Sequence, residues 1–298
     1  MTSREIFALR KSGRLDEVLA MARQCYEKTP EDLWLQRAYG WVIHDCLKRD
    51  IGSFEAKHLS SGTLTSRLNH WLTLYRQFGE KDRPGILYSQ IIRLAIKGSK
   101  VWPGFLDFAR WWDKAYFQVK DKEPFVTSDG PVINSLQQQY LHAIGREIVA
   151  RVGKLDLGLL AWGESQLAEA LKEHPDDQWL HYYTSKLLLN RNQCEEARQH
   201  LLPVVRRQGR AAWVWGLLGH TFDPARPDQA ITCYSYAIHL ATSPQEVAKT
   251  HIALATLLVN QQRFDQAATQ VREALKYREG PEHAEFSDAD VWSTDEAG

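Results

Sequence analysis

Apolar residues recur along the chain with the three- and four-residue spacing of amphipathic helices, and short polar turns separate pairs of such stretches. The clearest pair runs from His251 to Leu275, with a polar turn over residues 260–263 between its two apolar stripes. Small residues at Ala255 and Ala267 would let the two helices approach each other closely. The pattern therefore predicts an antiparallel helix–turn–helix unit.

Similar units precede this one. A first helix over Trp215 to Phe222 is followed by a break that contains two prolines, and a second helix covers Ala230 to Ile238. The prolines mark the turn because proline cannot continue a helix. A further unit covers Ser185 to Val204, and Gly13 to Pro30 repeats the turn and second helix near the N-terminus. Recurrence of one unit predicts a repeat architecture.

These residues resemble the tetratricopeptide repeat (TPR) family, whose unit of about 34 residues follows the pattern W-x2-L-G-x2-Y, then A-x3-F, A and P. The best match is formed by Trp215, Leu218, Gly219, Phe222, Ala230, Tyr234 and Ala237. The resemblance implies an all-α fold, a superhelical TPR-like solenoid of stacked helix pairs. It implies little about function, because this scaffold hosts many different roles.

The middle of the chain departs from the repeat pattern. It predicts helices over residues 64–78, 86–96, 105–117 and 136–152, with a charged loop over residues 120–132. We therefore expect TPR-like helices over residues 1–50, an irregular helical section over 51–152, TPR-like repeats over 153–277, and an acidic, disordered tail over 278–298.

Three short stretches also resemble a narrower group of bacterial TPR proteins associated with conflict and defence genes. They are Leu9 to Glu17, Arg37 to Val42 and Phe108 to Trp112. Some members of that group carry a cold-shock-like nucleic-acid module after the repeats, and no β-rich segment follows Gly280 here. The resemblance implies a bacterial protein and adds nucleic-acid binding to the functions to be weighed.

The charges balance, with 37 Lys and Arg against 37 Asp and Glu, so the total indicates neither a nucleic-acid nor a membrane-surface protein. The distribution is uneven, because seven acidic residues and one base follow residue 277 and leave the remainder at +6. A solvated tail is one interpretation. The other is a tail that folds back on a basic face and competes with a ligand.

Motifs for catalysis are missing from the sequence. It contains no glycine-rich phosphate loop, no H-E-x-x-H, no G-x-S-x-G and no zinc-like Cys/His spacing. The four cysteines lack C-x-x-C spacing, and no apolar signal region or long apolar run occurs. We therefore expect a cytoplasmic protein that is not an enzyme, holds no cofactor or metal and does not enter a membrane. The sequence leaves the oligomeric state open.

In TPR proteins the first helix of each pair lines a concave face. Carried over to this chain, the resemblance implies a partner-binding face formed by Trp179, Tyr182, Lys186, Asn190, Trp213, His220, Lys249 and Asn260. Aromatic anchors mixed with hydrogen-bonding groups suit an extended peptide or a helix, so the prediction is a scaffold that binds a protein partner. The rival interpretation is packing by a capping element.

The alternative is a nucleic-acid-binding accessory protein. Four arginines cluster within one repeat, at positions Arg198, Arg206, Arg207 and Arg210. Arginines beside aromatic planes could hold a single strand through phosphate contacts and base stacking, and the competing interpretation is an ordinary solvated face. Trp213 and Trp215 differ by about 200° around one helix, so at least one of them should be half exposed.

Overall fold

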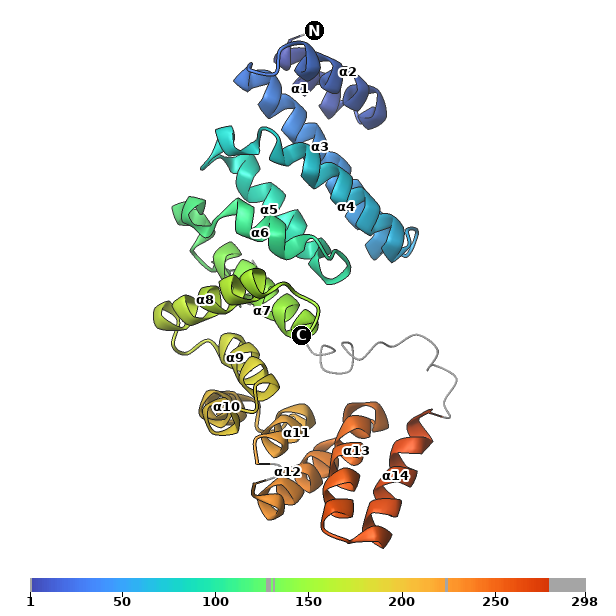
Figure 1. The fold of residues 1–298 in the computed structure, drawn as a ribbon. Coiled ribbons are helices and arrows are strands. Elements are labelled where there is room, and N and C mark those ends of the chain that lie inside the picture. The colour runs from blue at the N-terminus through green and yellow to red at the C-terminus, as the bar shows by residue number, and fades with distance from the viewer. Residues whose placement is uncertain (1, 127–129, 131, 223–224, 279–298) are drawn as a thin grey trace. The chain divides into compact units, whose positions relative to one another are not determined.

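The structure, a computed structural model, describes residues 2–126, 130, 132–222 and 225–278. Within these residues the chain forms fourteen α-helices, four short 3-10 helices (η) and one two-stranded sheet (Figure 1). The all-α class predicted from the sequence is confirmed. The chain divides into two compact units, unit 1 over residues 1–148 and 154–163, and unit 2 over residues 149–153 and 164–298.

Unit 1 begins with helices that are fixed at their first turns by capping side chains. Thr2 and Glu5 form a reciprocal capping box at α1, and Asp32 accepts hydrogen bonds from Trp34 N and Leu35 N at the start of α3. The helices in chain order are α1 Ser3–Lys11, α2 Leu15–Lys28, α3 Leu33–Glu55, α4 Ser61–Arg76, α5 Ile86–Gly98, α6 Phe105–Trp112 and α7 Leu136–Arg151, the last of which continues into unit 2. The 3-10 helices are η1 Gly79–Asp82, η2 Ser99–Val101, η3 Lys114–Tyr116 and η4 Val119–Asp121.

The core of unit 1 is rich in aromatic side chains. Trp112 is fully buried and stacks on Tyr88, with ring centroids 4.7 Å apart and an interplanar angle of 15°. The Trp112 indole nitrogen donates to the backbone oxygen of Tyr88, which satisfies its one polar group. This tryptophan therefore serves packing and offers nothing to a partner.

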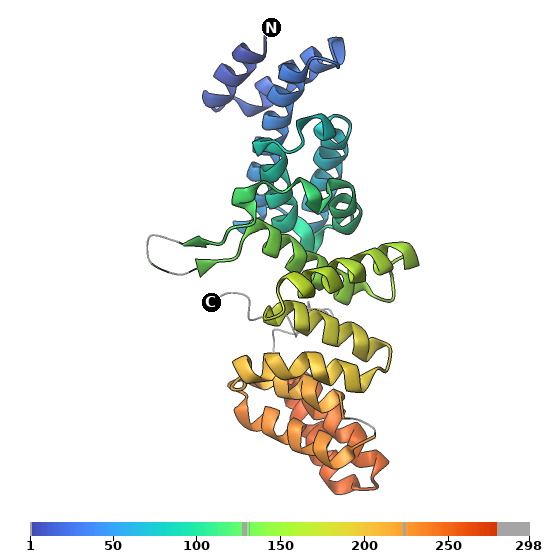
Figure 2. The same cartoon turned by 90° about the vertical axis from the view of Figure 1, so that its left-hand side faces the viewer.

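Two elements of unit 1 differ from the expectation. The helix predicted over residues 105–117 ends at Trp112, because Asp113 adopts a positive φ of 65° that an α-helix cannot continue through. The charged segment contains a small antiparallel sheet of β1 Phe125–Val126 and β2 Val132–Ile133, which projects from the helices in Figure 2. All four strand residues are exposed.

Unit 2 consists of helix pairs of the kind that the repeat pattern predicts. Its helices are α8 Leu157–Glu173, which begins in unit 1, α9 Gln178–Asn190, α10 Cys194–Gln208, α11 Ala212–His220, α12 Pro227–Leu240, α13 Pro244–Asn260 and α14 Phe264–Arg278. Helices α9 and α10, α11 and α12, and α13 and α14 pack against each other in pairs (Figure 1).

The small residues of the repeat pattern lie where helices meet. Ala230 and Ala237 of α12 are fully buried, and the Tyr234 ring between them lies directly against Gly219 of α11. A side chain at Gly219 would occupy the space that the Tyr234 ring fills. The glycine is therefore required by the close approach of α11 and α12, as the TPR pattern implies.

Three further observations bear on the expectations. Among the described residues, no helix combines the length and the apolar character that crossing a bilayer requires. Cys46 and Cys233 are buried as free thiols, whereas Cys25 and Cys194 are partly exposed. The acidic tail from residue 279 onward lies outside the described residues, so the expectation of disorder stays a prediction.

Candidate functional site

Three aromatic rings from two successive first helices form a cluster in unit 2. Trp179 and Trp213 stack with centroids 6.2 Å apart and planes 12° apart. Tyr182 meets both rings edge-on, at 5.9 Å from Trp179 and 5.2 Å from Trp213. Trp179 and Trp213 are partly exposed and Tyr182 is buried, so the cluster has a fixed base and two accessible rings.

Local sequence places these rings at the starts of their helices. Asp177 caps α9 by accepting hydrogen bonds from Trp179 N at 2.9 Å and Leu180 N at 3.2 Å. Tyr182 follows Trp179 by three positions and therefore lies on the same side of α9. Trp213 occupies the first turn of α11, so α9 and α11 bring their first turns together at the cluster.

A lysine adjoins the rings, and a second lysine lies near the first. The Lys186 ammonium lies 5.6 Å from the centre of the Tyr182 ring, in the geometry of a cation–π contact. Burial, together with the nearby positive charge of Lys249, lowers the pKa of Lys186 to about 8. No carboxylate of the described residues forms an ion pair with Lys186. A cation in such surroundings favours the approach of an anionic group, because a carboxylate would stabilise the charged form and raise the pKa of Lys186 toward its ordinary value.

Five of the predicted partner-binding residues therefore lie together. We call them the aromatic–lysine face, which consists of Trp179, Tyr182, Lys186, Trp213 and Lys249. The face is formed by α9, α11 and α13, the first helices of three successive pairs (Figure 1). This is the set of helices that the TPR resemblance implies for a binding face.

The other three predicted residues have different surroundings. Asn190 is exposed on α9 and donates its amide to the backbone oxygen of Lys186 at 3.0 Å. His220 forms a hydrogen bond of 3.0 Å with the Tyr234 hydroxyl, which ties it to the interior of its own helix pair. Asn260 is exposed at the end of α13. These contacts and positions lie outside the ring cluster, so we place the three residues at its margins.

The predicted arginine patch divides into two parts. Arg198 donates to the backbone oxygen of Thr221 at 2.6 Å, pairs with Glu195 at 2.6 Å and lies over the Phe222 ring. These contacts hold α10 to the end of α11, which is a structural role. Arg206, Arg207 and Arg210 are exposed and line a shallow depression between α10 and α11. Of the four predicted arginines, these three remain available on the surface.

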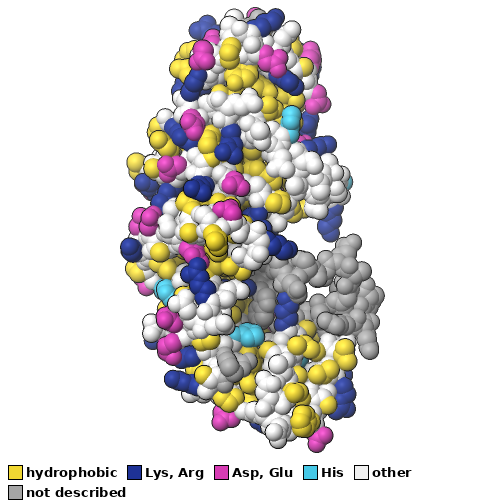
Figure 3. All heavy atoms as spheres, viewed as in Figure 1, with side chains coloured by type: hydrophobic (Ala, Val, Ile, Leu, Met, Phe, Trp, Pro, Cys, Tyr) yellow, Lys and Arg dark blue, Asp and Glu magenta, His cyan; other side chains and the backbone are white. Residues whose placement is uncertain are grey.

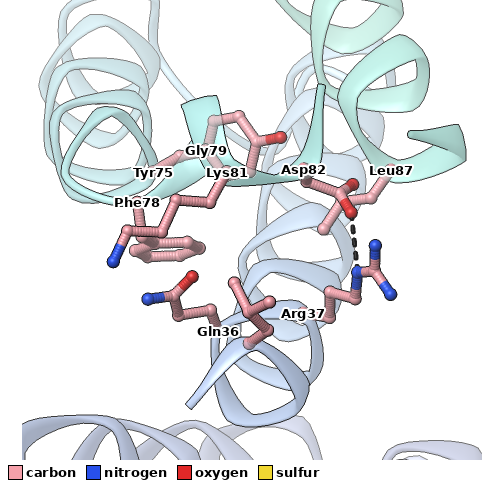
Figure 4. Close-up of a pocket in the computed structure, with 9 residues that line it drawn as sticks. Gln36, Arg37, Tyr75, Phe78, Gly79, Lys81, Asp82 and Leu87 are labelled. Carbon is pink, nitrogen blue, oxygen red and sulfur yellow. Dashed lines mark hydrogen bonds and ion pairs between the residues drawn. The ribbon is translucent and has the colours of Figure 1, made fainter. Parts of the chain in front are cut away.

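A pocket in unit 1 was not predicted from the sequence. Figure 4 shows Gln36 and Arg37 of α3 facing Lys81 and Asp82 of η1, with the Arg37–Asp82 ion pair of 2.8 Å at its rim. The enclosed free space is about 10 Å³, enough for one water molecule. The buried Tyr75 hydroxyl at its wall has no partner in the described structure, and a water would satisfy it. The pocket is too small for an organic ligand.

Charge and metal-binding groups give no stronger candidate. On the face shown in Figure 3, Lys and Arg side chains alternate with Asp and Glu side chains over α1 to α6 without a continuous field of one sign. In the part of the chain that the structure describes, no three His, Cys, Asp or Glu side chains are grouped to hold a metal ion. The aromatic–lysine face is therefore the best-formed candidate site.

The fold is that of an all-α helical-repeat protein built from TPR-like helix pairs. The sequence model of a family described as "Domain of unknown function (DUF7017)" matches residues 178–294, which is less than half of the chain. The match begins at the first residue of α9 and includes the whole aromatic–lysine face. No curated protein matches the chain.

Several solved structures are similar to the chain at low identity. "MamA 41-end from Desulfovibrio magneticus RS-1" is 19% identical with a TM-score of 0.48, over 64% of this chain and 93% of that one. "MamA MSR-1 C2" is 17% identical with a TM-score of 0.41, over 72% of this chain and 97% of that one. Similarity at this level carries no inference about function, and the resemblance to bacterial defence proteins stays a prediction.

Proposed function

We propose that this protein is a non-enzymatic scaffold that binds a segment of a protein partner on its aromatic–lysine face. The observation that carries the proposal is the convergence of Trp179, Trp213 and Lys186, from helices of two different repeats, on one partly exposed surface. Large aromatic rings are common binding anchors because they bury much apolar area at a small cost in side-chain entropy.

The chemistry of the face indicates what the segment contains. The stacked rings favour an apolar or aromatic side chain, and Lys186 favours an acidic one nearby. An extended peptide or one face of a helix can present both groups a few residues apart. The partner segment in this proposal is therefore acidic and contains an apolar or aromatic anchor.

Lys186 supports the proposal in a second way. A largely desolvated cation without an ion-pair partner is unfavourable for folding, since the charged form loses hydration and gains no pairing energy. Its presence beside two partly exposed tryptophans has an explanation in binding, because an incoming carboxylate supplies the missing pairing. If the face served only to pack against a neighbouring helix, the buried charge of Lys186 would have no such explanation.

A display library of random peptides selected on the full-length protein tests the proposal. We expect the enriched peptides to share acidic residues next to an aromatic or large aliphatic residue. Affinities of these peptides are then measured by titration calorimetry for the wild type, Trp213→Ala and Lys186→Met. Each substitution should lower affinity by about 1–3 kcal/mol.

Matched controls come from the same unit. Phe264→Ala removes a ring that is 62% exposed on α14, and Lys276→Met removes an exposed lysine of the same helix. Both variants should bind the selected peptides like the wild type. Equal losses from the face variants and the controls would refute the assignment of this face, as would enrichment of peptides without acidic residues.

A further inference from the structure

The junction between α10 and α11 carries three arginines around a depression of about 580 Å³. Arg206 and Arg207 lie in the last turn of α10, and Arg210 lies in the short connection to α11. All three are exposed, and among the described residues no carboxylate pairs with them. Favourable interaction with the C-terminal end of α10 accounts for Arg206 and Arg207, but it does not account for Arg210, which lies beyond the helix.

The start of α11 at this junction also favours an anion. Helix α11 begins at Ala212, and Ala211 at its N-cap position offers no side-chain acceptor to the first backbone N–H groups. Ala211 lines the same depression as the arginines. The positive end of the α11 dipole therefore lies beside the three guanidinium groups, which bind phosphate oxygens in a planar, two-point geometry.

Aromatic side chains continue from the depression onto α12. The Trp215 indole nitrogen donates to the backbone oxygen of Gly209, a residue that lines the depression, at 2.8 Å. Tyr236 meets Trp215 edge-on at 4.8 Å and is 42% exposed. His239 lies one turn further along α12, with its ring 6.3 Å from that of Tyr236. Aromatic rings therefore adjoin the arginine-lined depression.

We propose that Arg206, Arg207, Arg210, Trp215 and Tyr236 form a binding surface for single-stranded nucleic acid. Phosphates occupy the arginine-lined depression, and an adjacent unpaired base stacks on the exposed Tyr236 ring. Single strands fit this arrangement better than duplexes, because a duplex offers its phosphates but keeps its base faces covered. An acidic peptide would pair with the arginines, but it would not stack on the aromatic rings.

This surface is separate from the aromatic–lysine face. Trp213 and Trp215 both lie on α11 but point about 200° apart around the helix. Trp213 contacts Trp179 and Tyr182, whereas Trp215 contacts Tyr236 and the Gly209 backbone. The nucleic-acid proposal therefore goes beyond the protein-binding proposal, and either can fail without the other.

Fluorescence anisotropy with labelled single-stranded RNA and DNA oligonucleotides tests the proposal on the full-length protein. With three phosphate contacts, affinity should fall roughly 20-fold between about 50 and 200 mM salt. Neutralising the arginines in R206Q/R207Q/R210Q should weaken binding at least about tenfold at low salt and remove most of the salt dependence. Tyr236→Ala should weaken binding by about fivefold or more while leaving the salt dependence unchanged.

The control variant R263Q/R272Q/K276Q removes the same number of positive charges from exposed positions on and next to α14. It should bind oligonucleotides like the wild type. This result would distinguish a local binding site from non-specific attraction of the oligonucleotide to positive charge. The proposal is overturned if no oligonucleotide binds at low salt, or if both triple variants lose affinity equally. It is also overturned if duplex DNA or polyglutamate binds as tightly as the single strand, since charge alone would then explain binding.

Discussion

Trp179 and Trp213 stack with their ring planes 12° apart although 34 positions separate them in the chain. That separation equals the length of one TPR unit, so the two rings occupy the same position in successive repeats. Repetition of one residue type at one repeat position therefore produces a continuous aromatic surface. Tyr182 and the two lysines complete a face that suits an acidic segment with an apolar anchor.

Replacing Lys186 should stabilise the protein while it weakens binding. Its pKa of about 8 lies below the ordinary value of 10.5, so between these pH values the unfolded chain holds the proton more tightly than the folded one. At pH 7 we expect Lys186→Met to raise the free energy of unfolding by about 1–3 kcal/mol.

Urea unfolding followed by circular dichroism between pH 7 and 10.5 measures this effect. The stability of the wild type should rise with pH above about 8 and approach that of the variant, because the folded lysine becomes neutral first. A variant that is less stable than the wild type at pH 7 would show that Lys186 already has a compensating partner.

His181 and His200 couple stability to pH at the contact of α9 and α10. Their Nδ1 atoms lie 3.0 Å apart, and His181 Nε2 donates to the backbone oxygen of Pro175 at 2.8 Å. Burial and the neighbouring His181 lower the pKa of His200. The folded state therefore favours neutral His200, and stability should decrease as pH falls through the ordinary histidine range near 6.5.

Unfolding curves at pH 5 and pH 7.5 for the wild type and His200→Gln test this coupling. The variant should lose part of the acid sensitivity, whereas His239→Gln, at an exposed position of α12, should keep it. Identical pH dependence in the wild type and His200→Gln would contradict the assignment.

Much of unit 2 could be predicted from the sequence because its packing follows the repeat pattern. The spacing of Gly219, Ala230 and Tyr234 by itself indicates the contact of α11 and α12, and Tyr234 does lie against Gly219 in the fold. The positions carried over from the TPR family also grouped Trp179, Tyr182 and Lys186, which lie together on α9. For these residues, the spacing within a helix and the position within the repeat are enough to predict which side chains lie together.

Other features depend on contacts that spacing does not encode. The sequence groups Arg198 with three neighbouring arginines, but its surroundings are set by Thr221 and Phe222, which lie in the next helix pair. The sheet of β1 and β2 was missed because two-residue strands are too short to show an alternating pattern. The end of α6 depends on the positive φ of Asp113, a residue that is otherwise compatible with a helix.

Gly219 tests the repeat packing itself. In Gly219→Ala the added methyl group would occupy space taken by the buried Tyr234 ring, so we expect a loss of about 1–3 kcal/mol in stability. Gly153→Ala is the control, since nothing lies near its added methyl group. Thermal denaturation should show a lower midpoint for the first variant and little change for the second. Equal midpoints would show that α11 and α12 are less closely packed than described.

The buried cysteines should resist modification. Burial raises the pKa of Cys46 to about 12 and that of Cys233 to about 11, so both remain protonated thiols at neutral pH. Mass spectrometry after brief maleimide treatment should find label on Cys25 and Cys194 in the native protein. Cys46 and Cys233 should be labelled only in urea, and native labelling of Cys46 at the rate of Cys194 would contradict its burial.

The most direct test of the central claim is fluorine NMR of the protein labelled with 5-fluorotryptophan, titrated with a selected acidic peptide. Trp→Phe variants assign the resonances of Trp179 and Trp213, and the buried Trp112 of unit 1 provides an internal reference. We predict that the Trp179 and Trp213 signals shift together with one binding constant while the Trp112 signal stays unchanged. Saturable peptide binding that leaves both the Trp179 and Trp213 signals in place would contradict the claim that this face holds the partner.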